Sequence, residues 1–224
     1  IPVETPARRD TVIAEVPRAR EADVDRAVKA AAKAFESWKR MAARDRGKLM
    51  LKIAADMEAQ SEDLAKTLSL ETGNAIRTQS RGEIALAVDL FRFYGGVAGE
   101  QKGETVPLGE QVLCYSRREP IGVVAGIIPW NSPVLLGALK ITMALTVGNT
   151  LVLKPASDAP LAVLKMARIC NAHLPKGVLN VVTGLGSECG TMLARHPGVG
   201  KLSLTGSSEV GKTIMAAAAE RIVP

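Results

Sequence analysis

The sequence predicts an α/β fold built on a parallel sheet, and three observations support this class. Residues 121–128 form an uncharged run between two prolines, which is typical of a strand buried on both faces. Shorter β-prone runs follow it at intervals, and helical stretches separate the runs. Strands are expected at residues 121–128, 150–153, 178–182 and 201–205. This alternation predicts a parallel sheet with right-handed crossovers.

Each connection between these strands is expected to contain a helix. In the second connection Leu161, Leu164, Met166 and Ile169 fall close to one helix face. The helices are expected at residues 133–147, 159–173, 189–195 and 208–221.

Residues 1–102 carry more charge and are expected to be helical. Ser61 is expected to cap a helix with Glu62 and Asp63 in its first turn, and Gly73 to end it. Helical spacing marks further helices at Val24, Val28, Ala31, Phe35 and Trp38, at Leu49, Ile53 and Met57, and at Ile84, Val88, Phe91 and Gly95. We expect these helices to pack against the sheet.

Residues 103–118 differ from both neighbouring regions. Two short β-prone runs flank Gly109, which predicts a hairpin. A hairpin of two strands is marginally stable by itself in water. An ordinary surface hairpin is one interpretation, but contact with a partner chain or domain is the one we favour.

Asn131 directly follows the first predicted strand, in the sequence Pro129-Trp130-Asn131. Open α/β sheets bind ligands outside the carboxyl ends of their strands. A neutral amide at that edge can hold a developing oxyanion without bringing charge into a dry site. The alternative is a turn capped by the asparagine.

Three motif-like segments follow one another along the chain: Glu-Pro-Ile-Gly-Val-Val-Ala-Gly-Ile-Ile-Pro-Trp-Asn at 119–131, Gly-Asn-Thr-Leu-Val-Leu-Lys-Pro-Ala at 148–156 and Leu-Thr-Gly-Ser-Ser-Glu-Val-Gly at 204–211. They resemble successive motifs of the NAD(P)-dependent aldehyde dehydrogenases. Glu71-Thr72-Gly73 and residues 95–104 are also similar to that family. The resemblance implies a Rossmann-like NAD(P)-binding core at 119–224, an N-terminal helical part at 1–102 and an oligomerisation hairpin at 103–118.

The resemblance also implies a reaction. A cysteine attacks the aldehyde, the Asn131 amide holds the oxyanion, hydride passes to the nicotinamide, and a glutamate-activated water hydrolyses the thioester. The cysteine, the glutamate and the catalytic domain that carries them are expected beyond residue 224. This chain alone is therefore expected to be inactive.

Individual positions receive roles from the same resemblance. Asn131 and Lys140 are the implied catalytic residues, Lys140 in a proton relay, with an exposed helix lysine as the alternative. The implied cofactor-binding residues are Ile127, Ile128, Pro129, Trp130, Lys154, Ala156, Ser157, Gly186, Gly190, Thr205, Gly206, Ser207 and Val210. The alternative for Lys154 is a surface lysine, and for Gly186 and Gly190 plain turn glycines.

The implied substrate tunnel is lined by Ser132, Leu135, Leu136 and Leu139. None of these side chains is charged, so the expected substrate is an apolar or aromatic aldehyde. Arg92 is the one nearby residue able to bind a substrate carboxylate.

Ser157 bears on the choice of cofactor. In the family pattern the third residue after the strand-end lysine faces the adenosine ribose, where a glutamate favours NAD by repelling a 2′-phosphate. Ser157 is neutral, and Lys154 can pair with that phosphate. We therefore expect NADP to be accepted and preferred over NAD, with the Asp158 carboxylate as the opposing influence.

Residues 206–213 also match the phosphate loop of nucleoside triphosphatases. We reject that interpretation because the preceding strands and turns fit another family throughout. Gly206 and Gly211 still let the backbone approach a pyrophosphate at a helix N-terminus. Lys212 and Thr213 are expected to be solvated.

The three cysteines have neither metal-site nor disulfide spacing, which indicates a reducing compartment and predicts no metal site. Cys114 and Cys170 are expected to be structural. Cys189 is expected near a helix N-terminus, which lowers a thiol's pKa, but on the adenosine side rather than as nucleophile. His173 and His196 are expected at the surface.

Composition excludes two classes of partner. The net charge is +6, yet the basic residues form no long block, so nucleic acid is not expected. No apolar stretch is long enough for a bilayer and no signal-peptide pattern is seen, so the expected location is the cytoplasm. The expected assembly is a homo-dimer or homo-tetramer through residues 103–118. The alternatives are a non-catalytic dinucleotide-binding fragment and an assembly module whose hairpin recruits a partner.

Overall fold

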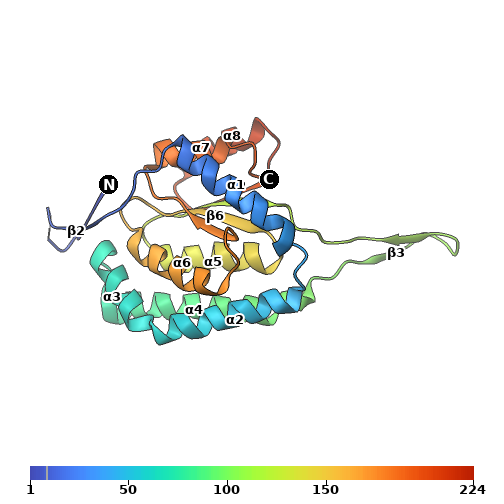
Figure 1. The fold of residues 1–224 in the computed structure, drawn as a ribbon, viewed down its shortest axis with the longest axis horizontal. Helices are drawn as coiled ribbons and strands as arrows, with labels where there is room; N and C mark the ends of the chain where they lie inside the picture. The colour runs from blue at the N-terminus through green and yellow to red at the C-terminus, as the bar shows by residue number, and fades with distance from the viewer. Residues whose placement is uncertain (9) are drawn as a thin grey trace.

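A four-stranded parallel sheet lies at the centre of the computed structural model, which describes residues 1–8 and 10–224 (Figure 1). Its strands are β5 (Val123–Ile127), β6 (Thr150–Lys154), β7 (Leu179–Val181) and β8 (Lys201–Leu204). The predicted α/β class and all four predicted strands are confirmed. Lys154, which the sequence placed just beyond a strand, is the last residue of β6.

The strand order is β7-β6-β5-β8, so the chain leaves β5 on one side and returns to it on the other. Both neighbours of β5 run parallel to it. This reversal creates a switch point between β5 and β8, the place where open α/β sheets form their ligand crevice.

Helices cover both faces of the sheet. One face carries α5 (Pro133–Thr146) and α6 (Leu161–His173), and the other carries α1 (Glu21–Trp38), α7 (Thr191–Arg195) and α8 (Ser208–Ala219). Side chains alternate between the faces along β6, with Leu151 and Leu153 in the α5–α6 core and Val152 in the α1–α7 core.

Three further helices form an outer layer over α5 and α6 (Figure 1). They are α2 (Ala43–Ala59), α3 (Ser61–Thr72) and α4 (Arg81–Gly96). Their buried side chains, such as Ile53, Leu68 and Phe91, belong to the same hydrophobic core as the side chains of α5 and α6. The expectation that the N-terminal helices pack against the sheet is correct for α1 and wrong for α2, α3 and α4, because α5 and α6 already cover that face.

Helix ends agree with the sequence in part. Gly73 ends α3 with a left-handed φ of 77°, as predicted. The prediction for Ser61 is wrong: Gln60 is the N-cap and Ser61 the first helical residue, because α2 runs into α3 without an intervening loop. π-Helical turns not foreseen from the sequence, Ile76–Ser80 and Gly186–Gly190, lead into α4 and α7.

Two antiparallel strand pairs lie outside the central sheet. The first, β1 (Pro2–Glu4) with β2 (Val12–Glu15), was not predicted, since residues 1–102 were expected to be helical. The second is the predicted hairpin, β3 (Thr105–Pro107) with β4 (Leu113–Tyr115), and it projects far from the body of the molecule (Figure 1). A short 3₁₀ turn, Ala98–Glu100, lies between α4 and this hairpin.

Gly103 fixes the base of the hairpin. A Cβ atom at this position would lie 1.8 Å from the backbone oxygen of Ser116, so only glycine fits. At the tip, Gly109 has a φ of 120°, which side chains disfavour. Among the described helices, none has both the length and the apolar character needed to cross a membrane.

Candidate functional site

The carboxyl ends of three strands meet at one edge of the sheet. Ile127 lies in register between Lys154 and Leu204. Beyond the strands, the Ile128 N–H donates to the Lys154 carbonyl at 3.1 Å, and the Thr205 N–H donates to the Ile127 carbonyl at 3.0 Å. The loops after β5, β6 and β8 therefore start side by side, and they carry most of the predicted site residues.

Asn131 is exposed on the loop between β5 and α5. A residue from another part of the chain holds this loop, because Asn74 Nδ2, after α3, donates to the Asn131 carbonyl at 3.3 Å. Among the described residues, the Asn131 carboxamide itself has no hydrogen-bond partner. It is thus free to donate to a ligand at the switch point.

Glu83 fixes the start of α5, directly after this loop. Its Oε1 accepts the N–H groups of Val134 at 2.9 Å and Leu135 at 3.1 Å. Burial raises the pKa of Glu83, and the two backbone hydrogen bonds oppose that shift. This role was not predicted, because a side chain that pairs with a helix start some fifty residues away leaves no periodic pattern in the sequence.

Glu71 does the same for α6, after the loop that follows β6. Its two oxygens accept the N–H groups of Leu161 at 2.6 Å and Ala162 at 2.9 Å. Burial raises the pKa of this carboxyl to about 7, with the two backbone bonds acting in the opposite direction. The sequence marked Glu71 as part of a motif but not as a helix cap.

Lys154 is buried, with 3% of its surface exposed, so the surface-lysine alternative is wrong. Its ammonium donates no hydrogen bond to the part of the chain that the structure describes. Burial lowers its pKa, while the nearby Cys189 and Asp158 act to raise it. A buried cation at the strand ends favours an anionic or hydroxyl-rich ligand.

Cys189 lies close to Lys154 in the turn before α7, and it is fully buried. Burial raises the pKa of its thiol, with Lys154 opposing that shift. The expectation of a lowered pKa is wrong, because removal from water outweighs the effect of the helix end. Cys170 is also buried, and Cys114 is half-buried on the hairpin.

Ser157 and Asp158 lie on the loop after β6. The Ser157 hydroxyl donates to Asp158 Oδ1 at 3.3 Å. Ser157 is half-buried and Asp158 is exposed. The Asp158 carboxylate therefore lies beside Ser157, the neutral residue on which the expected NADP preference rests.

The loop after β8 opens α8. Ser207 is its N-cap, and the Ser207 Oγ accepts the Val210 N–H at 3.3 Å. Lys212 is exposed, and the Thr213 hydroxyl donates back to the Glu209 carbonyl at 3.2 Å. The expectation that Lys212 and Thr213 are solvated helix residues is confirmed.

The remaining predicted cofactor residues lie at the same edge with varied exposure. Trp130, Gly186, Gly206 and Val210 are exposed, Pro129, Ala156 and Thr205 are half-buried, and Ile128 and Gly190 are buried. A Cβ atom added at Gly186 would meet no atom within 4 Å, whereas one at Gly190 would lie 4.0 Å from Lys154 Cδ. Gly186 is therefore open to a ligand and Gly190 sits against the lysine.

The predicted tunnel residues are all half-buried: Ser132 is the N-cap of α5, and Leu135, Leu136 and Leu139 lie on that helix. Arg92, named as a possible carboxylate ligand, is already paired on the outer layer. It bonds Glu58 of α2 at 2.5 Å and Asp89 at 3.4 Å.

Lys140 is buried between α5 and the sheet, so the alternative of an exposed helix lysine is wrong. Its Nζ donates to Ser203 Oγ on β8 at 3.0 Å. Burial lowers the pKa of Lys140 to about 8. Ser203 did not stand out in the sequence, because one serine in a strand carries no pattern.

The histidines are less exposed than expected. His173 and His196 are both half-buried, and each lies near an aspartate, Asp56 at 2.7 Å and Asp25 at 3.4 Å. Across residues 1–8 and 10–224, no group of three or more His, Cys, Asp or Glu side chains is arranged to hold a metal ion.

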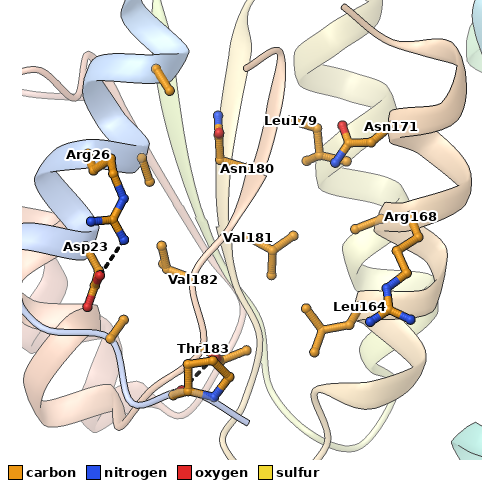
Figure 2. A pocket seen from close by; sticks show the side chains of 15 residues that line it. Asp23, Arg26, Leu164, Arg168, Asn171, Leu179, Asn180, Val181, Val182 and Thr183 are labelled. Atoms are coloured by element: carbon orange, nitrogen blue, oxygen red, sulfur yellow. Dashed lines mark hydrogen bonds and ion pairs between the residues drawn. The ribbon is translucent and has the colours of Figure 1, made fainter. Parts of the chain in front are cut away.

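A cavity of about 550 Å³ lies elsewhere, along the outer edge of β7 between α1 and α6 (Figure 2). Arg168 and Asn171 of α6 face it from one side, and the Asp23–Arg26 ion pair, at 2.6 Å, faces it from the other. It contains none of the predicted site residues. Because β7 is the strand farthest from β8, this cavity is separate from the switch point.

This chain is similar to known proteins over nearly all of its length. An acetaldehyde dehydrogenase of Pseudomonas aeruginosa is 41% identical over 212 residues, covering 95% of this chain and 42% of that protein. The NAD⁺ complex of an aldehyde dehydrogenase from Bacillus cereus superposes with a TM-score of 0.97 at 39% identity, covering all of this chain and 46% of the other.

The NAD complex of PnpE gives a TM-score of 0.96 at 41% identity, again covering all of this chain and 46% of the other. The chain thus spans somewhat under half the length of these relatives. The sequence profile described as the aldehyde dehydrogenase family matches residues 1–224. Strand-end geometry, motif order and similarity agree, and the chain belongs to the aldehyde dehydrogenase family.

Proposed function

We propose that this chain is the dinucleotide-binding part of an enzyme that oxidises an aldehyde to a carboxylic acid with NAD(P)⁺. The observation that carries the proposal is the alignment of Ile127, Lys154 and Leu204 at the switch point, with the free Asn131 amide beside them. Relatives crystallised with NAD have the same fold over this length.

The residues present fit a dinucleotide. Lys154 offers a buried ammonium, Gly186 leaves open space, and the N-terminus of α8 directs backbone N–H groups at the loop after β8. Lys154 would bond ribose hydroxyls or a phosphate, and Gly206 and Ser207 would lie along the pyrophosphate. When bound, the nicotinamide would accept hydride from the substrate.

A binding titration tests this part of the proposal. NAD⁺ or NADP⁺ added to the 224-residue chain should bind, and Lys154→Ala should weaken binding roughly tenfold or more. Lys212→Ala, which removes an exposed lysine of α8, is the matched control and should leave the affinity unchanged. Equal affinities of all three proteins would contradict the assignment of Lys154.

Asn131 is the proposed oxyanion donor. Its amide would bond the substrate oxygen as negative charge develops there. Its loop is held in place by the hydrogen bond that Asn74 donates and by the one that Glu83 accepts. In a longer protein that contains this chain and is active, Asn131→Ala should lower kcat by roughly 10²–10³-fold. Asn171→Ala, at an exposed site on α6, is the control, and an unchanged kcat in Asn131→Ala would remove Asn131 from the reaction. The 224-residue chain by itself is expected to show no turnover.

NADP is the proposed preferred cofactor. Ser157 is neutral, and the buried Lys154 nearby can pair with a 2′-phosphate. The Asp158 carboxylate beside Ser157 works against this preference. Titration of both oxidised cofactors decides the matter: Asp158→Asn should strengthen NADP binding and Ser157→Glu should favour NAD. NAD bound ten times more tightly than NADP by the unsubstituted chain would refute the preference.

The proposed substrate is an apolar or aromatic aldehyde. The half-buried residues Ser132, Leu135, Leu136 and Leu139 carry no charge, and Arg92 is paired with Glu58 and Asp89. In an active longer protein, kcat/KM should be higher for benzaldehyde-like compounds than for a dicarboxylic semialdehyde. The reverse order would overturn the assignment.

The proposed assembly is a homo-dimer or homo-tetramer joined through the hairpin, in the cytoplasm. Leu108, Leu113 and Tyr115 of the hairpin are more than half exposed. Sedimentation of the longer protein should give a dimer or tetramer, and Leu113→Glu should shift it toward monomer. An unshifted sedimentation coefficient would exclude the hairpin from the interface.

A further inference from the structure

The hydrogen bond between Lys140 and Ser203 depends on three elements. Lys140 projects from α5, Gly126 lies on β5, and Ser203 lies beside Gly126 on β8. Partners in a parallel pair present their side chains to the same face. Since Gly126 has no side chain, the lysine stem lies across β5: a Cβ atom there would be 3.2 Å from Lys140 Cδ.

This path brings the ammonium toward the reactive edge of the sheet. Gly126 and Ser203 are each the last residue but one of their strand. The loops that follow those strands carry Asn131 and Gly206. The backbone of Lys140 lies in the middle of α5. Its side chain extends from there, so that its Nζ lies between the ends of β5 and β8, at the switch point.

Ser203 is the one hydrogen-bond acceptor that the described residues offer to this ammonium. Lys140 is only 8% exposed, so little water is available to replace it. A buried ammonium without an acceptor is costly, and the side chain would then turn away or release its proton.

From this geometry we infer that Ser203 is a positioning residue, whose hydroxyl holds the Lys140 ammonium at the mouth between β5 and β8. The inference rests on the proposed function, together with the proton-relay role that the family resemblance implies for Lys140. Ser203 acts through Lys140 and does not itself touch the substrate.

The protonation of Lys140 gives a direct test in the 224-residue chain. With ¹³Cε-labelled lysine, NMR titration follows Lys140, and Lys140→Met identifies its signal. Loss of an acceptor disfavours the charged form, so Ser203→Ala should lower the Lys140 pKa by about one pH unit, a tenfold change in the proton equilibrium. Ser203→Thr keeps the hydroxyl and should restore the original titration.

Controls separate positioning from packing. Ser37→Ala removes an intrahelical hydroxyl of α1 and should leave the Lys140 titration unchanged. If Ser203→Ala fails to fold, Ser203→Val has the shape of Ser203→Thr without its hydroxyl and should show the same downward shift. A folded Ser203→Ala or Ser203→Val chain in which Lys140 titrates as before would overturn the inference.

The cofactor titration keeps the two proposals apart. A chain that binds no dinucleotide, but whose Lys140 responds to Ser203, contradicts the proposed function and supports the positioning. A chain that binds the dinucleotide, but whose Lys140 ignores Ser203, contradicts the positioning alone. In an active longer protein, Ser203→Ala should also move the Lys140 limb of the kcat–pH profile, and an unmoved limb would show that the positioning does not serve the reaction.

Discussion

The buried carboxylate of Glu83 accepts the backbone N–H of Val134 at 2.9 Å, three residues after Asn131. Glu83 belongs to α4 in the outer layer and Val134 to the first turn of α5. The direction in which α5 leaves the sheet is therefore set from outside the sheet. The same bond fixes one end of the loop that presents Asn131.

Removal of this cap should destabilise the fold. In Glu83→Ala the N–H groups of Val134 and Leu135 lose their acceptor, and the free energy of unfolding should fall by about 2–3 kcal/mol in urea titrations. Glu36→Ala on α1 deletes an exposed partner of Lys39 and should cost less than about 0.5 kcal/mol. Equal losses in the two variants would mean that Glu83 does not act as a cap.

Glu71 should make stability depend on pH. Its pKa is raised to about 7 in the folded chain from 4.5, so the folded state binds the proton more tightly than the unfolded state. The free energy of unfolding should therefore fall as pH rises from 4.5 to about 7, by at most about 3 kcal/mol from this group. Urea titrations of Glu71→Gln at several pH values should show a flatter dependence than the parent, and parallel curves would contradict the assignment.

Gly126 should not tolerate a side chain. A Cβ atom would lie 3.1 Å from Leu153 Cδ1 and 3.2 Å from Lys140 Cδ, so Gly126→Ala should destabilise the chain by about 1–3 kcal/mol. At Gly82 in α4 the same change meets no atom within 4 Å and should stabilise by about 0.5–1 kcal/mol. Thermal unfolding of both variants checks the contrast, and a neutral Gly126→Ala would show that the lysine stem has room to move.

The three thiols should react in two classes. Cys114 is half-buried on the hairpin, whereas Cys170 and Cys189 are buried with raised thiol pKa values. Ellman's reagent should label one thiol of the folded chain quickly and all three in denaturant. A second fast equivalent that disappears in Cys189→Ala would show that Cys189 is accessible after all.

Much of the fold was predictable because strand and helix alternate repeatedly along the second half of the chain. Buried parallel strands read as uncharged runs, and β5 to β8 lie within two residues of the predicted ends. The pair β1–β2 was missed because strands of three and four residues with mixed exposure carry little signal. The outer position of α2, α3 and α4 was missed because an apolar helix face does not tell which surface it covers.

The site was predictable where it follows strand ends and not where it depends on distant pairs. The positions of Asn131 and Lys154 at the edge of the sheet were predictable because these residues follow or end β-prone runs. Asn74, Glu71, Glu83 and Ser203 act through partners 51 to 91 residues away, and such pairing leaves no trace in local sequence. Cys189 was misjudged for a related reason, since its burial depends on the packing of α1 and α7.

The projecting hairpin contributes no buried side chain to any core of the molecule: β3 is wholly exposed and β4 has only Cys114 half-buried. The central sheet and its helices consequently do not need the hairpin in order to fold. Folding of one chain should proceed at a rate independent of protein concentration, and the proposed association through the hairpin should follow as a later second-order step. Until that step occurs, two free strand edges remain open to any other extended chain, which makes dilution during refolding favourable to yield.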